Sequence, residues 1–204
     1  TYAHDTVWFI AGSLAMGATM VKHGLDKRIG MLVMNLSGTK VRNVVLGILV
    51  GTAIPSAFIS EASIAPMFLP IAMALYTLTT KKIGDATQLG KLLMMSIAIG
   101  CMVGAPMSPT GGARNAIMIG FLANLGPEYE ISFMQWMVLG SFYTLFLGIF
   151  FAILLPFLYK PEVDDLSDAV NTLREDLKKH GDMTREQWMV AGVALLMIIA
   201  WITD

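Results

Sequence analysis

A stretch near the middle of the chain holds one carboxylate among hydroxyl side chains and prolines. It reads "PSAFISEASIAPMFLP", residues 55–70, and Glu61 is the only charged residue from Asn43 to Thr80. A charge at the centre of a bilayer costs at least about 2.5–3.5 kcal/mol, so we interpret Glu61 as a candidate functional residue. The hydroxyls of Ser56 and Ser60 can donate and accept hydrogen bonds beside it.

A second apolar segment carries one charge of the opposite sign. Between Leu92 and Pro127 only Arg114 is charged, and the sequence around it reads "GAPMSPTGGARNA", residues 104–116. An unpaired buried charge costs several kcal/mol, so we hypothesise that Glu61 and Arg114 lie close together at the tips of two broken helices. The alternatives are a purely structural pair, or two side chains that reach water separately. Asn115, at the start of a half-helix, can both donate and accept.

The composition places these residues in a membrane protein. The chain has 204 residues, 55% hydrophobic and 14% charged, with a mean hydropathy of +0.65. Soluble domains carry about 25% charged residues. The net charge of −1 argues against a nucleic-acid partner, and the single cysteine, Cys101, excludes a disulfide within the chain. The chain starts at Thr1 with no signal-peptide pattern, so we expect it to begin inside a longer protein.

Other chemistries have weaker support. His4, His23 and His180 lack the spacing of metal ligands, so we expect no metal site and no cofactor. A membrane-embedded enzyme with Glu61 as general acid or base is an alternative, but it needs a second titratable group, and Arg114 stays charged. A structural membrane subunit is a further alternative, which leaves the two central charges unexplained.

The apolar segments predict an all-α integral membrane protein, because a helical span needs about 20 apolar residues. Residues 1–42 predict a scaffold helix followed by an interfacial segment. Residues 43–80 are long enough for two helical arms, and Pro55, Pro66 and Pro70 predict that these arms are broken. Basic residues at both ends of this segment favour a re-entrant hairpin whose ends lie on one face of the membrane.

Four further segments complete the predicted order. The loop 124–132 has two glutamates and no Lys or Arg, so we expect it to face outside. Apolar residues from Val163 to Leu177 step by three and four, as on an amphipathic helix. Thr184 and Gln187 form a capping-box signature. The segments are a broken transmembrane helix at 91–124, with half-helices near 91–103 and 114–124, a transmembrane helix at 131–159, a cytoplasmic arm helix at 161–181 that begins at Pro161, and a transmembrane helix at 184–203.

Together these residues resemble the divalent anion/sodium symporter family, carriers of dicarboxylates, citrate and sulfate. Each half of that family has a re-entrant hairpin tipped by Ser-Asn-Thr, followed by a methionine-rich "MLPIA" arm. Here "ISEASIAPMFLPIAMAL" is similar, with Ser60, Glu61 and Ala62 in the motif's place. The family's broken helix has a Gly-Thr/Ser-Pro-Pro-Asn loop, where this chain has residues 111–115 followed by "AIMIG". The early "FIAGSLAMGATMVKHGLDKRIG" resembles the family's scaffold helix, so the similarity covers nearly the whole chain.

The resemblance implies a secondary active, cation-coupled transporter of dicarboxylates such as succinate or malate, or of inorganic anions such as sulfate. It implies that the chain is one inverted repeat of an elevator-type transporter, and that the half of the binding site contributed by the second repeat lies outside this chain. It also implies a homodimer in the inner membrane of a bacterium or archaeon. The implied substrate-binding residues are Ser60, Glu61, Ala62 and Asn115. The implied ion-binding residues, with Na⁺ as the ion, are Ser56, Ser60, Glu61, Gly111, Gly112, Arg114 and Asn115.

Three positions depart from the family's pattern. Glu61 replaces an amide with an anion, Ala62 removes a hydroxyl, and Arg114 puts a fixed positive charge close to the implied sodium site. The guanidinium can take the place of bound Na⁺, with Glu61 holding it, so a sodium-independent anion exchanger is an alternative. A proton-coupled carrier, in which the Glu61 carboxyl carries the proton, is another.

Overall fold

The computed structural model describes residues 5–59, 61–178 and 183–203, and this part of the chain consists of helices joined by turns. The all-α prediction is therefore confirmed for the described residues. In chain order the α-helices are α1 (Asp5–Lys22), α2 (Leu25–Leu36), α3 (Val41–Ser56), α4 (Glu61–Ile83), α5 (Thr87–Gly104), α6 (Ala113–Ala123), α7 (Phe133–Leu158), α8 (Ser167–Lys178) and α9 (Arg185–Thr203). Short 3-10 turns are η1 (Ala105–Met107), η2 (Pro109–Gly111) and η3 (Pro127–Tyr129).

Three segments within the described part are long and apolar enough to cross a membrane. They are Ser63–Ile83, Thr87–Met107 and Phe133–Leu158, so they fall in α4, in α5 with η1, and in α7. Only 6% of the most apolar part of α7 is buried inside the chain. Such an apolar and exposed helix fits a lipid or protein environment rather than water.

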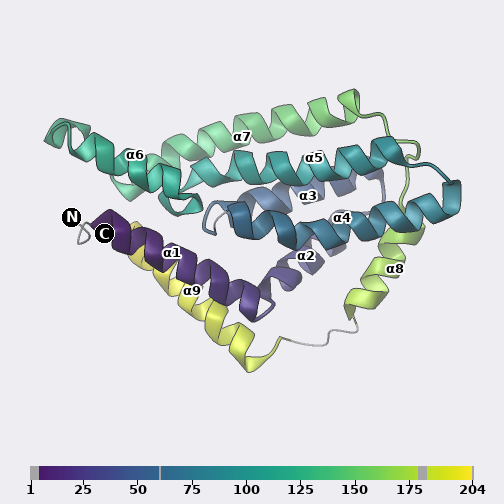
Figure 1. Cartoon of the computed structure of the whole chain (residues 1–204), viewed down its shortest axis with the longest axis horizontal. Helices are drawn as coiled ribbons and strands as arrows, with labels where there is room; N and C mark the ends of the chain where they lie inside the picture. Colours follow the sequence, from purple (N-terminus) through teal and green to yellow (C-terminus); the bar gives the residue numbers. More distant parts are fainter. Residues whose placement is uncertain (1–4, 60, 179–182, 204) are drawn as a thin grey trace.

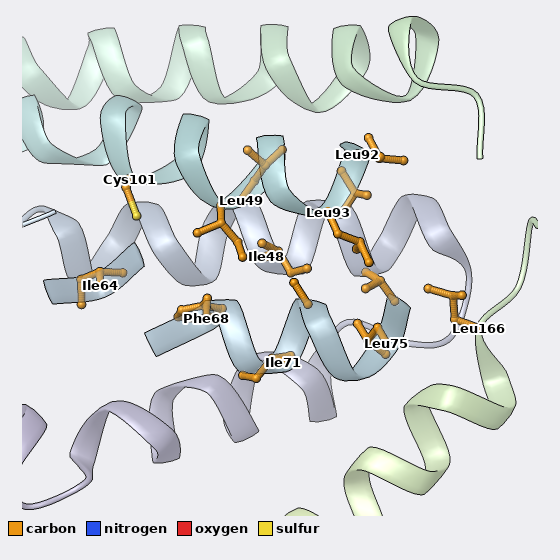
Figure 2. Close-up of a cluster of buried hydrophobic side chains, with 14 of the residues drawn as sticks. Ile48, Leu49, Ile64, Phe68, Ile71, Leu75, Leu92, Leu93, Cys101 and Leu166 are labelled. Carbon is orange, nitrogen blue, oxygen red and sulfur yellow. The ribbon is translucent and has the colours of Figure 1, made fainter. Parts of the chain in front are cut away.

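The hydrophobic core forms where α3, α4 and α5 pack against one another, with α7 along the outer side of α5 (Figure 1). Ile48 of α3, Phe68 of α4 and Leu93 of α5 are almost fully buried in it. Figure 2 shows these side chains converging from the three helices. Fully burying one such side chain is worth roughly 1.5–3 kcal/mol, so this cluster sets the relative positions of the three helices.

Glycines allow α5 to approach α3 unusually closely. A Cβ atom on Gly104 would lie 2.1 Å from the carbonyl oxygen of Ala53, and one on Gly100 would lie 2.0 Å from Thr52 Oγ1. Small residues at such contacts let helix backbones pack closely, which is typical of membrane helices.

The hairpin of α3 and α4 differs from the prediction of broken arms. Helix α4 is continuous through Pro66 and Pro70, and Pro55 lies in the last turn of α3. The chain instead turns between Ser56 and Glu61. Both prolines of α4 lie on its exposed side, whereas Phe68 and other residues of the opposite side are buried. Burial of that side stabilises the helix against the cost of about 3 kcal/mol that a proline imposes on a helix.

The predicted arm helix begins at Ser167, and not at Pro161. The preceding residues are held away from helical geometry by the other end of the hairpin: the Val41 amide donates to the Asp164 carbonyl at 3.0 Å, and the Leu166 amide donates to the Thr39 carbonyl at 2.8 Å. The predicted end of this helix near Gly181 lies outside the described residues. The buried residues Leu166 and Val170 pack it against α2 and α4.

Helices α1 and α9 lie side by side along one edge of the molecule (Figure 1). The predicted capping box at the start of α9 is confirmed, because the Thr184 amide donates to Gln187 Oε1 and the Gln187 amide to Thr184 Oγ1, each at 3.2 Å. Gln187 also donates to the His23 carbonyl at 2.9 Å, which joins α9 to the end of α1.

Candidate functional site

The break between α5 and α6 is a compact, hydrogen-bonded turn. Asn115 Nδ2 donates to the carbonyl oxygens of Ala105 and Ser108, each at 2.8 Å. The hydroxyls of Ser108 and Thr110 lie 2.9 Å apart, and Thr110 Oγ1 donates to the carbonyl oxygen of Ala57 at 3.2 Å. Because Ala57 follows the last residue of α3, this last bond ties the break to the tip of the hairpin.

Gly111 brings the two interrupted segments into backbone contact. A Cβ atom at this position would lie 2.2 Å from the Ala105 carbonyl oxygen and 2.6 Å from the Ser56 carbonyl oxygen. No larger residue fits there without moving one of these two backbones. A Cβ atom on neighbouring Gly112, in contrast, would meet nothing within 4 Å.

Glu61 and Arg114 form an ion pair that joins the first turns of α4 and α6, which approach each other in Figure 1. Arg114 Nη2 donates to Glu61 Oε1 at 2.5 Å, so the predicted proximity of the two charges is confirmed. A carboxylate at a helix N-terminus is favoured by the helix dipole, and a guanidinium there is disfavoured. The carboxylate of Glu61 therefore compensates for the unfavourable interaction between the Arg114 guanidinium and the dipole of α6.

The two partners of this ion pair differ in exposure. The Arg114 side chain is 69% exposed and the Glu61 side chain 29%. Glu61 Oε2 is nevertheless buried and has no hydrogen-bond partner in the described part of the chain, and the same holds for Ser56 Oγ. A buried polar atom without a partner costs about 1–3 kcal/mol, so a polar ligand that reached these two oxygens, on either side of the hairpin tip, would be favoured there.

The structure places the other predicted residues unequally. Ser60 lies outside the described residues, and for Ala62 only the backbone, in the first turn of α4, is described. The side-chain nitrogen of Asn115 is used within the break, so this residue shapes the site internally. Among the described residues there is no group of three or more His, Cys, Asp or Glu side chains that could hold a metal ion.

Ser108 and Thr110 were not among the predicted site residues, although they link the break to the hairpin. The available signal was the pair of hydroxyl residues in "SPTGG", inside a segment already expected to be non-helical. Such hydroxyls replace backbone hydrogen bonds that an interrupted helix loses.

The whole chain, residues 1–204, matches the family described as the sodium:sulfate symporter transmembrane region. It is 25% identical to a citrate/succinate antiporter of Escherichia coli K12, over 98% of this chain and 42% of that protein. It is 24% identical to the sodium-dependent dicarboxylate transporter SdcS of Staphylococcus aureus USA300, over 99% of this chain and 40% of that protein. A membrane protein of Cupriavidus necator is 22% identical, over 100% of this chain and 39% of that protein. The chain thus spans about two-fifths of the length of these relatives.

Proposed function

We propose a function from the premise that this chain belongs to the sodium:sulfate symporter family, which its match over residues 1–204 establishes. Members of this family are membrane transporters. The chain is therefore an integral membrane protein, and we assign it to a divalent anion carrier and not to an enzyme. We place the transport site where the hairpin tip meets the break between α5 and α6. The observation that carries this assignment is the Glu61–Arg114 ion pair, which joins two interrupted membrane segments.

The proposed substrate is a dicarboxylate such as succinate or malate. The names of two relatives, a citrate/succinate antiporter and a sodium-dependent dicarboxylate transporter, support this choice over an inorganic anion such as sulfate. The N-terminal ends of α4 and α6 favour an anion of either kind, because the helix dipole is positive there.

The proposed coupling ion is a cation, with Na⁺ as the first candidate. Ser56 Oγ and Glu61 Oε2 are buried oxygens that have no hydrogen-bond partner among the described residues, and oxygen ligands of this kind suit a hard cation. With Gly111 and Gly112 in the adjacent turn, they form the part of the proposed ion site that this chain supplies.

A sodium-independent exchanger is the second candidate, because the Arg114 guanidinium already supplies a positive charge beside Glu61. A proton-coupled carrier that uses the Glu61 carboxyl is the related third candidate. In both, the fixed charge of Arg114 replaces the charge of a bound sodium ion.

Uptake of labelled succinate and labelled sulfate into vesicles, with Na⁺ replaced by choline at two pH values, separates these candidates. Sodium coupling predicts that succinate uptake disappears in choline at both pH values. Uptake that persists in choline at both pH values supports exchange, and uptake that depends on the pH gradient supports proton coupling. No uptake of either anion under any condition would contradict the carrier assignment itself.

We also propose the membrane arrangement that the family resemblance implies. The hairpin α3–α4 would be re-entrant and would move with α5 and α6 as an elevator-like transport unit, with α8 in the connecting arm and the protein as a homodimer. The continuous packing of α3, α4 and α5 supports the moving unit. Cross-linking of the protein in native membranes, read by dimer bands on denaturing gels, tests the dimer.

A further inference from the structure

We propose that Arg114 contacts a carboxylate of the transported anion directly and that Glu61 is its internal counterion. This inference rests on the proposed function, because it assigns a substrate contact within that site. It also differs from the sequence-based assignment, which placed substrate contacts at positions 60–62 and at Asn115 and gave Arg114 only an ion-site role.

The first argument is the set of hydrogen-bond donors that Arg114 leaves open. A guanidinium carries five N–H donors in a rigid planar fork that matches a carboxylate with two parallel bonds. In the described part of the chain only Nη2 of Arg114 is engaged, by Glu61 Oε1. The remaining donors belong to a side chain that is 69% exposed, so an arriving anion can reach them.

The second argument is the unequal burial of the pair. Glu61 is less exposed, at 29%, and its Oε2 atom is fully enclosed. An anion that approaches this site therefore meets the guanidinium first and the carboxylate behind it. Arg114 attracts the anion, whereas Glu61 weakens that attraction by partial neutralisation.

The third argument is the position of Arg114 on its helix. It is the second residue of α6, where the helix dipole already favours an anion and disfavours a cation. A guanidinium held at this point combines its charge with the free N–H groups of the helix end. Asn115 and Thr110 are the neighbouring side chains that could also donate to an anion, but their donors are used in hydrogen bonds to backbone carbonyls of the break and the hairpin tip.

The test measures KM and the maximal rate of labelled succinate uptake in proteoliposomes that contain the full-length protein. Arg114→Gln should raise KM at least tenfold, because it removes the charge and the fork. Arg114→Lys should give an intermediate KM, since it keeps the charge and loses the fork. Glu61→Gln, measured at saturating Na⁺, should lower KM for succinate, because the charge that opposes the anion is gone; loss of its proposed ion contact would appear separately, as a higher Na⁺ concentration needed for uptake. Arg42→Gln, an exposed arginine in the first turn of α3 at the other end of the hairpin, is the matched control and should leave KM unchanged.

A purely structural ion pair predicts a different pattern, in which Glu61→Gln and Arg114→Gln raise KM alike; that result would overturn the proposal. If Arg114→Gln abolishes measurable uptake, stabilisation of the protein by succinate in thermal unfolding decides instead. Stabilisation that is lost in Arg114→Gln but kept in Arg114→Lys and Glu61→Gln supports the contact, and stabilisation kept in Arg114→Gln overturns it. If the unaltered protein neither takes up nor binds succinate, the proposed substrate and this inference are refuted together. If Arg114→Gln takes up succinate with an unchanged KM, this inference alone is refuted.

Discussion

At the scale of single residues, the Glu61–Arg114 pair determines how the two interrupted segments meet. Each residue lies in the first turn of its helix, and the 2.5 Å hydrogen bond between them joins α4 to α6. Because Arg114 is mostly exposed, solvent screens the attraction between the two charges. Its stabilising effect and its role toward the anion can therefore be measured separately.

Exchanging the two charges tests the stabilising effect. Glu61→Arg alone places two guanidinium groups together and Arg114→Glu alone places two carboxylates together, so each single variant should unfold at a lower temperature. The double variant restores opposite charges and should recover about 0.5–3 kcal/mol relative to the sum of the singles. Thermal unfolding in detergent measures this coupling, and strict additivity of the two single effects would contradict it.

Gly104 offers a second test at this scale. Gly104→Ala puts a methyl group 2.1 Å from the Ala53 carbonyl oxygen, so α5 and α3 must separate. We expect a loss of about 1–3 kcal/mol in the free energy of unfolding, as for other overpacked sites. Gly148→Ala in α7, where a Cβ meets nothing within 4 Å, is the control and should change stability little. Equal effects of the two substitutions, measured by unfolding in detergent, would count against close packing of α3 and α5.

At the scale of elements, the segment before α8 caps the start of α5. Helix α5 has no side-chain cap of its own at Ala86. The Gln88 amide donates to Glu162 Oε1 at 2.7 Å and the Leu89 amide donates to Glu162 Oε2 at 3.0 Å. Two free N–H groups at the start of a long membrane helix are thus satisfied by a residue that follows α7 in the sequence.

This cap makes a specific contribution to the pH dependence of stability. Partial burial raises the pKa of Glu162, but the hydrogen bonds from Gln88 and Leu89 outweigh it and hold the pKa below its ordinary value of 4.5. A carboxyl with a lowered pKa stabilises the folded state fully above the unfolded value, and this stabilisation is lost as pH falls through the folded pKa.

Glu162→Ala should therefore cost about 0.5–2 kcal/mol at pH 7, the usual value of a lost cap, and progressively less as the pH falls below 4.5. Unfolding midpoints of the variant and the unaltered protein across this pH range measure the difference. Glu175→Ala, an exposed glutamate on α8, is the control and should show no comparable difference at pH 7. A difference that grows on acidification would contradict the capping role.

At the scale of the whole molecule, α8 is held against the hairpin by two kinds of contact. Lys82 at the end of α4 forms an ion pair with Asp168, and both side chains are mostly exposed. Leu166 and Val170, in contrast, are 2% and 0% exposed and pack into the core. We attribute the docking of this predicted arm mainly to the apolar contact, because exposed ion pairs contribute little.

The two contributions can be ranked by substitution. Leu166→Ala should destabilise the protein by about 2–5 kcal/mol through loss of buried surface and cavity formation. Asp168→Asn should cost less than about 1 kcal/mol. Thermal unfolding and protease sensitivity of α8 are the measurements, and a larger effect of Asp168→Asn than of Leu166→Ala would reverse this ranking.

The sequence by itself determined the helical membrane class, the positions of the two interruptions and the pairing of Glu61 with Arg114. These features follow from local hydropathy, from Gly and Pro content and from the cost of an unpaired charge in an apolar segment. The capping box at Thr184 is equally local, because its two residues lie in one helical turn.

Only the tertiary structure decided how the interruptions are built and how the far segments meet. Whether Pro66 and Pro70 break α4 depends on the core that buries its opposite side, and the start of α8 depends on contacts with Thr39 and Val41. The link from Thr110 to Ala57 and the cap that Glu162 places on α5 join residues far apart in the chain. Hydrogen bonds between distant residues follow from three-dimensional packing, and no local pattern of residue types specifies them.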